Sequence, residues 1–393
     1  MQSVPTRRSD FEPADRVREV REYFFSRKLR EIADMRAAGR DVVSLGIGGP
    51  DRPPQPSVVE TLCRESRRGD VHSYQPYAGI AELREEFARW YVRRFGVELD
   101  PSREVLPLIG SKEGILHVSL AFLNPGDGVL VPDPGYPAYT SVSRLVGARI
   151  YSYGLDARNG WMPDFEELER MPLDRVKLMW VNYPNMPTGA RATRGTFERL
   201  IDFARRHRIV VVNDNPYCFI LNDNPLSILS ADGARDVAIE LNSLSKSHNM
   251  AGWRVGMLAS CSRFTEWILR VKSNVDSGMF RPLQSAAAEA LRAGDGWYAE
   301  QNRVYARRRA AAERIMLAAG CTFDSSQTGL FLWGRVPAGM TGGELADRLL
   351  YDAGVFVTPG AVFGSRGEEY IRISLCASEE RMAEALARIE KMM

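Results

Sequence analysis

The sequence has few of the residues that build disulfides or metal sites. Its five cysteines are an odd number, lie far apart and include no Cys-x-x-Cys pair, and its four histidines are equally dispersed. This usage argues against a disulfide framework and against a zinc site. We therefore expect reduced thiols, a cytoplasmic protein and no bound metal.

Two further absences narrow the class of protein. No apolar run approaches the ~20 residues needed to span a bilayer, and the charged N-terminus lacks the apolar core of a signal peptide. The net charge is only +2, so nothing indicates a nucleic-acid partner or a membrane-surface patch. What is present is an ordinary globular composition, 45% hydrophobic and 26% charged over 393 residues, which is long enough for two domains.

Apolar runs of β-type residues alternate with helical patterns between about residues 78 and 274. This alternation predicts an α/β domain with a mainly parallel sheet that helices cover on both faces. We expect seven strands, at 105–109, 128–132, 148–153, 176–182, 208–213, 237–242 and 255–259. We expect helices between them at 78–95, 113–122, 137–146, 195–207 and 262–272.

The pattern differs on either side of this region. Residues 14–38 are charged and helix-prone, and a short strand near residue 42 runs into a glycine-rich turn. The C-terminal part predicts an α+β domain with helices and short strands at 283–292, 297–318, 330–335, 371–375 and 379–391. We therefore expect an N-terminal arm that packs with a small domain, a large domain and the small domain itself, at 1–44, 45–280 and 281–393.

The strongest chemical signal lies in residues 243–254, where Ser-Leu-Ser-Lys-Ser-His is followed by Gly-Trp-Arg. The apolar run before it predicts a buried strand, so Lys246 stands at a strand end. Desolvation and a nearby cation both lower a lysine pKa, which frees the lone pair for imine formation. Hydroxyls, backbone amides and Arg254 suit a phosphate. Alone, the stretch is explained as well by a solvated lysine in a loop.

Other polar side chains follow neighbouring predicted strands, where ligands bind in open α/β sheets. Ser111 and Lys112 open a helix, whose N-terminal amides favour an anion. Tyr136 offers an aromatic ring, and Asp214 a carboxylate that burial disfavours unless it meets a cation. Singly, each has a structural explanation. Together they supply a phosphate site, a stacking ring and an acid beside the lysine.

These features resemble the fold-type I, class I/II aminotransferases that use pyridoxal 5′-phosphate (PLP), and the resemblance covers nearly the whole chain. Within that family the sequence is most similar to the LL-diaminopimelate and alanine aminotransferase group. The intervals of 32 residues from Asp214 to Lys246 and of eight from Lys246 to Arg254 match the family. The matching positions are Gly48, Tyr74-Gln75-Pro76, Gly110-Ser111-Lys112, Tyr136, Pro187-Thr188-Gly189, Asp214, Tyr217, Ser243, Lys246, Arg254 and Arg372.

The resemblance implies an enzyme that moves an amino group between an L-amino acid and a 2-oxo acid. Its fold would be a large domain with a seven-stranded mainly parallel sheet plus a smaller α+β domain. Lys246 would form the Schiff base with PLP and transfer protons, Asp214 would protonate the pyridine nitrogen, and Tyr217 would hydrogen-bond the phenolic oxygen. Tyr136 would stack on the ring, and the phosphate would be held by Ser111, Lys112, Ser243, Ser245 and Arg254.

The same resemblance implies where substrate and a second subunit bind. Arg372 would hold the substrate α-carboxylate with the help of the Gly48 amide, and Tyr23 would reach the substrate from the N-terminal segment. Tyr74 would reach the phosphate of a neighbouring subunit, which implies a homodimer with shared active sites.

The sequence departs from the family just before Pro187-Thr188-Gly189. Methionine stands at 186, where the family has an asparagine that donates to the phenolic oxygen, and Met186 cannot donate. Either Asn185 takes over or Tyr217 acts alone. The second case leaves open another PLP reaction, such as elimination, cyclisation or an oxidase-like step. A non-enzymatic PLP-binding regulator is a third possibility, against which Lys246 argues. The donor and acceptor stay open.

Overall fold

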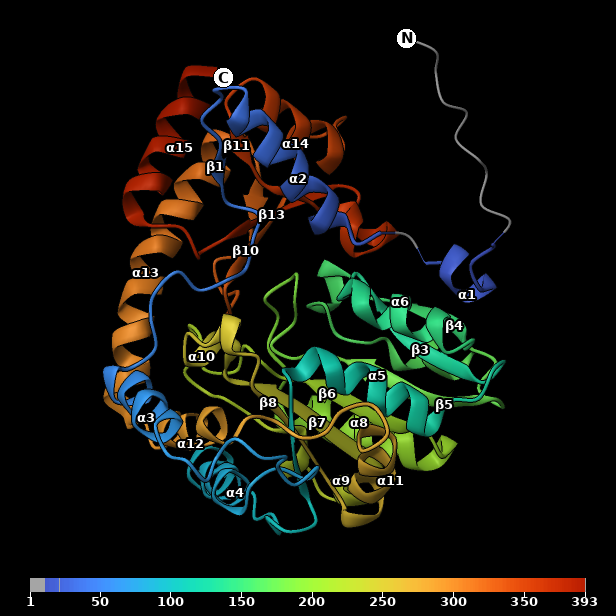
Figure 1. Ribbon diagram of the computed structural model, residues 1–393. Coiled ribbons are helices and arrows are strands. Elements are labelled where there is room, and N and C mark those ends of the chain that lie inside the picture. The colour runs from blue at the N-terminus through green and yellow to red at the C-terminus, as the bar shows by residue number, and fades with distance from the viewer. Residues whose placement is uncertain (1–10, 21, 393) are drawn as a thin grey trace.

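A seven-stranded sheet forms the centre of the computed structural model, which describes residues 11–20 and 22–392 (Figure 1). All neighbouring strands are parallel except at β8, which runs antiparallel to both of its neighbours. The predicted fold class is therefore confirmed. In sheet order the strands are β2 (Val105–Leu108), β8 (Gly256–Ser260), β7 (Ala238–Ser243), β6 (Val210–Asp214), β5 (Val176–Val181), β3 (Gly128–Asp133) and β4 (Arg149–Gly154).

Helices cover both faces of this sheet, and alternate strand residues pack against different helices. Trp180 of β5 packs in one cluster, whereas Met179 and Val181 pack in the other. This two-sided burial explains the nearly continuous apolar strands. The first face carries α5 (Ser111–Phe122), α6 (Pro137–Leu145) and α11 (Ser262–Lys272). The second carries α3 (Pro56–Ser66), α4 (Ala81–Phe95), α7 (Phe165–Glu169), α8 (Arg194–His207) and α12 (Arg281–Leu291).

The C-terminal part forms a second sheet with its own apolar cluster. Its strand order is β12 (Thr358–Pro359), β13 (Tyr370–Ser374), β10 (Phe331–Arg335) and β9 (Thr322–Phe323). The long helix α13 (Asp295–Ala318) runs beside it with α14 (Gly342–Tyr351) and α15 (Glu379–Met392), as Figure 1 shows. The division at residues 44 and 280 stays a prediction.

The N-terminal segment joins this C-terminal part. Strand β1 (Val43–Ser44) pairs with β11 (Val355–Phe356), and Ile32 shares an apolar cluster with Leu350. The helix-prone segment 14–38 forms two helices, α1 (Asp15–Arg18) and α2 (Phe24–Ala37). Tyr23, between them, has extended backbone with φ −57° and ψ 126°.

The carboxyl ends of the parallel strands face this C-terminal part. Backbone hydrogen bonds join the two, from Gly329 to Ile220, from Thr328 to Gly189 and from Gly135 to Phe363. The loops that carry the predicted site residues are therefore held between two sheets. Among residues 11–20 and 22–392, no helix combines the length and the apolar character needed to cross a membrane.

Candidate active site

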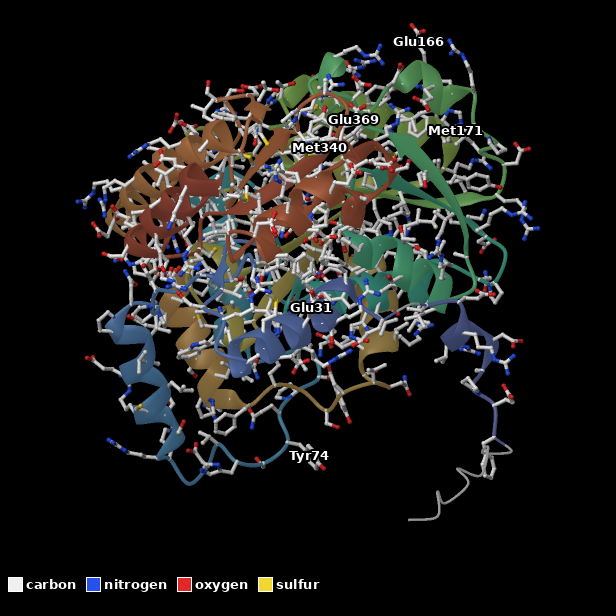
Figure 2. The ribbon with its side chains drawn as sticks, turned by 90° about the horizontal axis from the view of Figure 1, so that it is seen from above. Glu31, Tyr74, Glu166, Met171, Met340 and Glu369 are labelled. Atoms are coloured by element: carbon white, nitrogen blue, oxygen red, sulfur yellow. The ribbon has the colours of Figure 1, made fainter. Side chains whose placement is uncertain are left out.

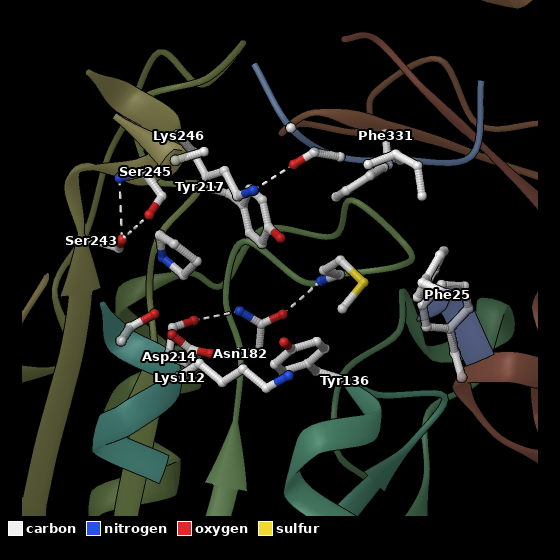
Figure 3. Close-up of a pocket in the computed structure, with 18 of the residues that line it drawn as sticks. Phe25, Lys112, Tyr136, Asn182, Asp214, Tyr217, Ser243, Ser245, Lys246 and Phe331 are labelled. Atoms are coloured by element: carbon white, nitrogen blue, oxygen red, sulfur yellow. Dashed lines mark hydrogen bonds between the residues drawn. The ribbon is translucent and has the colours of Figure 1, made fainter. Parts of the chain in front are cut away.

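One cavity of about 360 Å³ lies at the carboxyl ends of the parallel strands. All of the predicted site residues except Asn185 and Tyr74 line it (Figure 3). Four cations line the cavity, and in the described part of the chain none of them forms an ion pair with a carboxylate: Lys112, Lys246, Arg254 and Arg372. Such a cavity favours an anionic ligand.

Lys246 enters the cavity from the short helix α10 (Leu244–Ser247), which follows β7 directly. Its ammonium group donates a hydrogen bond to the carbonyl oxygen of Gly48 (Figure 3). Burial lowers the pKa of Lys246, and the charges of Arg372 and Arg254 add to this effect. Burial therefore shifts Lys246 toward the deprotonated form that acts as a nucleophile.

Asp214 ends β6 and is almost fully buried. Its Oδ2 accepts a hydrogen bond of 3.0 Å from the Tyr139 hydroxyl, whereas Oδ1 has no partner among the described residues. Burial raises the pKa of Asp214 to about 7, and the charge of Glu240 adds to the rise. A buried carboxylate with one free oxygen is suited to a ligand that brings a positively charged N–H.

Tyr139 is a site residue that sequence reasoning missed. It lies on α6, three residues after Tyr136, and its ring stacks on Trp180 at 5.0 Å between centroids and 4° between planes. In the sequence Tyr139 is indistinguishable from a packing residue of a helix. The available signal was its spacing, because residues i and i+3 share a helix face.

The anion-binding corner is built from hydroxyls, amides and Arg254. The hydroxyl of Ser243 accepts from the Ser245 backbone amide at 3.1 Å and lies 2.8 Å from the Ser245 hydroxyl, and Arg254 Nη1 lies 3.4 Å from the latter. Ser111 opens α5, so its amide faces the same corner. A Cβ at Gly110 would lie 2.2 Å from Arg254 Nη2, so the corner requires glycine there.

Lys112 lies apart from this corner, toward the outer part of the cavity. Its ammonium group stands 4.5 Å from the centre of the Tyr23 ring. Burial lowers the pKa of Lys112, and the Arg254 charge contributes. Lys112 therefore contributes positive charge near the N-terminal segment as well as at the start of α5.

Arg372 is held in the middle of β13 with only 4% of its surface exposed. Nη2 donates to the Gly46 carbonyl at 2.8 Å, Nη1 lies 3.2 Å from the Met186 sulfur, and Nε has no partner in the described part. The centres of the Phe331 and Phe363 rings lie 3.8 and 4.6 Å from the guanidinium carbon of Arg372. Burial lowers the pKa of Arg372 to about 10. This cation forms no ion pair with a carboxylate in the part of the chain that the structure describes, and it is suited to a ligand carboxylate.

The turn after β5 brings Asn182 and Met186 to the cavity, but not Asn185. Asn182 Nδ2 donates to the Asp214 carbonyl, and its Oδ1 accepts from the Met186 amide at 2.7 Å (Figure 3). Asn185 Oδ1 instead accepts from the Thr188 hydroxyl at 2.8 Å, inside the turn. Asn185 Nδ2 is buried without a partner among the described residues, but Asn185 does not line the cavity, so its role as a replacement donor stays a prediction. Asn182 is a second cavity residue that sequence reasoning missed.

The two remaining aromatic predictions have different surroundings. Tyr217 lines the cavity with its ring against Phe331, and burial raises its pKa. Tyr74 is 90% exposed and lies at the edge of the molecule (Figure 2). It is not among the residues that line the cavity.

These features fit PLP, which carries a phosphate, a basic ring nitrogen and an aldehyde. The unpartnered oxygen of Asp214 could accept a hydrogen bond from the protonated ring nitrogen. The corner at Ser243 suits the phosphate, and the amine of Lys246 suits the aldehyde. The parallel-sheet fold and this donor set define the class of PLP-dependent fold-type I enzymes.

Comparison with known proteins specifies the family. The chain belongs to the class I and II aminotransferases, whose family model matches residues 40–389. It is 42% identical over 387 residues to an LL-diaminopimelate aminotransferase of Oleidesulfovibrio alaskensis, covering 98% of this chain and 100% of the relative. An enzyme of the same name from Moorella thermoacetica is 42% identical over 382 residues, covering 97% and 98%.

Solved structures agree with this family. BacF from Bacillus subtilis superposes with a TM-score of 0.93 at 34% identity, covering 97% of this chain and 98% of BacF. A variant of Thermus thermophilus aspartate aminotransferase superposes with a TM-score of 0.90 at 27% identity, covering 98% and 100%. The predicted family is confirmed, and the protein is a PLP-dependent aminotransferase.

Proposed function

We propose that this cavity transfers the α-amino group of an L-amino acid to a 2-oxo acid, with the residue roles given below. The observation that carries the proposal is that one cavity holds a buried Lys246, whose pKa burial lowers, and a buried Arg372 that forms no ion pair with a described carboxylate. When bound, PLP supplies an aldehyde that takes up the amino group and a ring that accepts electrons from the substrate Cα.

Lys246 is the proposed base. Its amine would hold the aldehyde carbon of resting PLP and, once displaced by the substrate amine, move a proton between the substrate Cα and that carbon. The Gly48 carbonyl orients the amine from one side. The low-pKa environment keeps Lys246 able to accept the proton.

Asp214, supported by Tyr139, would keep a proton on the ring nitrogen. Tyr136 would pack on the ring, and Tyr217 would donate to the phenolic oxygen, because Met186 supplies no donor. We assign the phosphate to the corner described above, formed by Ser111, Ser243, Ser245 and Arg254. The Lys112 ammonium group, which lies beside Tyr23, would add positive charge to the cavity rather than a direct phosphate contact.

Arg372 would bind the substrate α-carboxylate, with the Gly48 segment beside it. Tyr23 and Lys112 stand at the outer end, where they would meet the substrate side chain. The relatives named above make LL-diaminopimelate the first donor to test.

We further propose a homodimer with shared active sites and a cytoplasmic location. Large side chains near Tyr74 are exposed, including Tyr77 at 48% and Phe280 at 44%, and a second copy would cover them. All five cysteines are free thiols, which suits a reducing compartment.

The test is a screen of amino donors against the purified holoenzyme without an oxo-acid acceptor. A transaminase must convert its PLP to pyridoxamine phosphate and release one oxo acid per site. The Lys246→Ala variant should lose both the visible absorbance of the lysine-bound cofactor and all turnover. Retention of either would contradict the role of Lys246.

A different PLP reaction is the second candidate, and Met186 is the observation that favours it. Elimination or cyclisation would consume the donor while the visible PLP spectrum returns without an oxo-acid acceptor, and an oxidase-like step would do so with dioxygen as the electron acceptor. The same screen therefore separates the two candidates.

A further inference from the structure

A second buried carboxylate, Glu240, lies behind the cavity on β7. It is 0% exposed, and no ion pair joins it to a cation in the part of the chain that the structure describes. Four donors surround it: the Tyr91 hydroxyl at 2.9 Å, the Ile228 amide at 3.0 Å, Asn213 Nδ2 at 3.1 Å and Asn215 Nδ2 at 3.4 Å. Burial raises the pKa of Glu240, whereas these donors and the Ser227 hydroxyl oppose that rise because they stabilise the ionised form.

The orientations of both asparagines are set by other bonds. Asn213 Oδ1 accepts from the Tyr183 amide at 3.0 Å, and Asn215 Nδ2 also donates to the Leu226 carbonyl at 3.0 Å. The amino groups must therefore face Glu240. Their donor role does not depend on a free choice of amide orientation.

These two asparagines flank Asp214. Glu240 stands opposite Asn213 in the register of β6 and β7, and the Asn215 amide donates to the Leu241 carbonyl. Asn213 also holds the Tyr183 amide, next to Asn182, which donates to the Asp214 carbonyl. One carboxylate thus anchors the backbone on both sides of Asp214 and the turn that follows β5.

The charge of Glu240, like its hydrogen bonds, affects how Asp214 would hold a protonated ring nitrogen. The titratable groups that face Glu240 are Tyr91, Cys218 and Asp214, and no described cation contributes to its environment. A negative charge behind Asp214 makes a proton on the ring side of Asp214 more favourable.

We propose that Glu240 is a positioning residue for PLP, which holds Asp214 in place and adds the negative charge that favours a protonated ring nitrogen. The proposal rests on the role of Asp214 given above. In this proposal Glu240 influences PLP binding through Asp214 and contacts neither the cofactor nor the substrate itself.

The test compares two ligands on full-length protein freed of cofactor. PLP and an analogue with carbon in place of the ring nitrogen are titrated, with tryptophan fluorescence as the readout. In Glu240→Gln we expect affinity for PLP to fall about tenfold, the equivalent of one pKa unit, and affinity for the analogue to change by less than about twofold.

Glu86→Gln is the matched control. Glu86 is also buried, at 3% exposure, but it pairs with Arg89 and Arg93 on its own helix. It should leave the ratio of the two affinities unchanged. An equal loss for both ligands in Glu240→Gln, or no loss for either, overturns the proposal.

A second variant covers the case in which Glu240→Gln does not fold. Tyr91→Phe keeps the carboxylate but removes its hydroxyl donor, and we expect the ratio to shift in the same direction by about threefold. An unchanged ratio in a folded Tyr91→Phe protein overturns the proposal. If the unaltered protein itself does not prefer PLP over the analogue, the fault lies instead with the role of Asp214.

Discussion

Asp214 carries a charge that the fold without cofactor stabilises poorly. Its pKa is raised to about 7 from an ordinary 3.8, so the folded state binds this proton more tightly than the unfolded chain. The folded state therefore loses stability as pH rises between these values, and the loss is complete above about pH 7. A protonated ring nitrogen would offset this loss.

Asp214→Asn should therefore stabilise the cofactor-free protein at high pH while weakening PLP binding. We expect the free energy of unfolding to rise by at most about 4 kcal/mol at about pH 8 and not at all at about pH 4, because the pKa of Asp214 differs by roughly three between the folded and unfolded states. Thermal melts at both pH values test this. An equal gain at both would show that the charge is not the cause.

Arg372 is the second residue whose environment anticipates a ligand. Arg372→Ala should raise KM for any amino donor by roughly 10²-fold, if a charge-assisted pair worth ~3 kcal/mol is lost. Arg372→Lys keeps the charge but loses the planar guanidinium group, so its KM should lie between the KM of the wild-type enzyme and that of Arg372→Ala. Steady-state kinetics would refute the assignment if KM were unchanged in the alanine variant.

Met186 lines the cavity, and its sulfur lies 3.2 Å from Arg372 Nη1. Met186→Asn should lower the pH midpoint of the visible absorbance change by about one unit, because one new hydrogen bond to a charged oxygen is worth ~1.5 kcal/mol. Met186→Leu, which adds no donor, should leave the midpoint in place. A pH titration of the holoenzyme's spectrum decides the matter.

At the scale of elements, the phosphate corner depends on how closely β8 approaches the start of α5. A Cβ at Gly256 would lie 2.7 Å from the Ser111 amide nitrogen and 2.8 Å from the Asn242 carbonyl oxygen. Both contacts are backbone atoms, which cannot move aside without displacing α5 or β7. The absent side chain therefore sets the position of the helix N-terminus.

Gly256→Ala should cost about 1–3 kcal/mol of stability and weaken PLP binding by about tenfold, because the strain falls on the phosphate corner. Gly252→Ala, where a Cβ meets nothing within 4 Å, is the matched control. Thermal melting and PLP titration measure the two effects. If Gly256→Ala were as stable as the control, the backbone around Gly256 could move to admit a Cβ, and the steric argument would be wrong.

At the scale of the whole molecule, the exposed Tyr74 suggests that one chain does not complete its own site. Light scattering should give twice the chain mass of 44.1 kDa. In a mixed dimer of Lys246→Ala and Tyr74→Ala chains, one site regains both residues and the other loses both. Half of the wild-type activity per dimer is expected. Each parent homodimer should have little activity. A mixed dimer no more active than its parents would mean that Tyr74 acts within its own chain, and a fully active Tyr74→Ala homodimer would mean that Tyr74 has no role in the site.

The sheet was predictable to within two residues at nearly every strand end, because buried parallel strands leave unbroken apolar runs. Helices α3 and α14 were not predicted. Helix α3 begins at Pro56 and is preceded by Pro50, Pro53 and Pro54, a run that is typical of a loop. Proline is nevertheless well tolerated in the first turn of a helix.

The sequence by itself determined the family, the fold class and the residues that follow strand ends. Those signals are local: a lysine, a carboxylate and an arginine at set intervals after apolar runs. Only the tertiary structure decided which other groups support them. Tyr139, Asn182 and Glu240 form hydrogen bonds with residues distant in the chain, whereas the Asn185 side-chain oxygen accepts from Thr188 within its own turn. Burial and packing of neighbouring strands, which no local pattern encodes, set these contacts and the pKa values that follow from them.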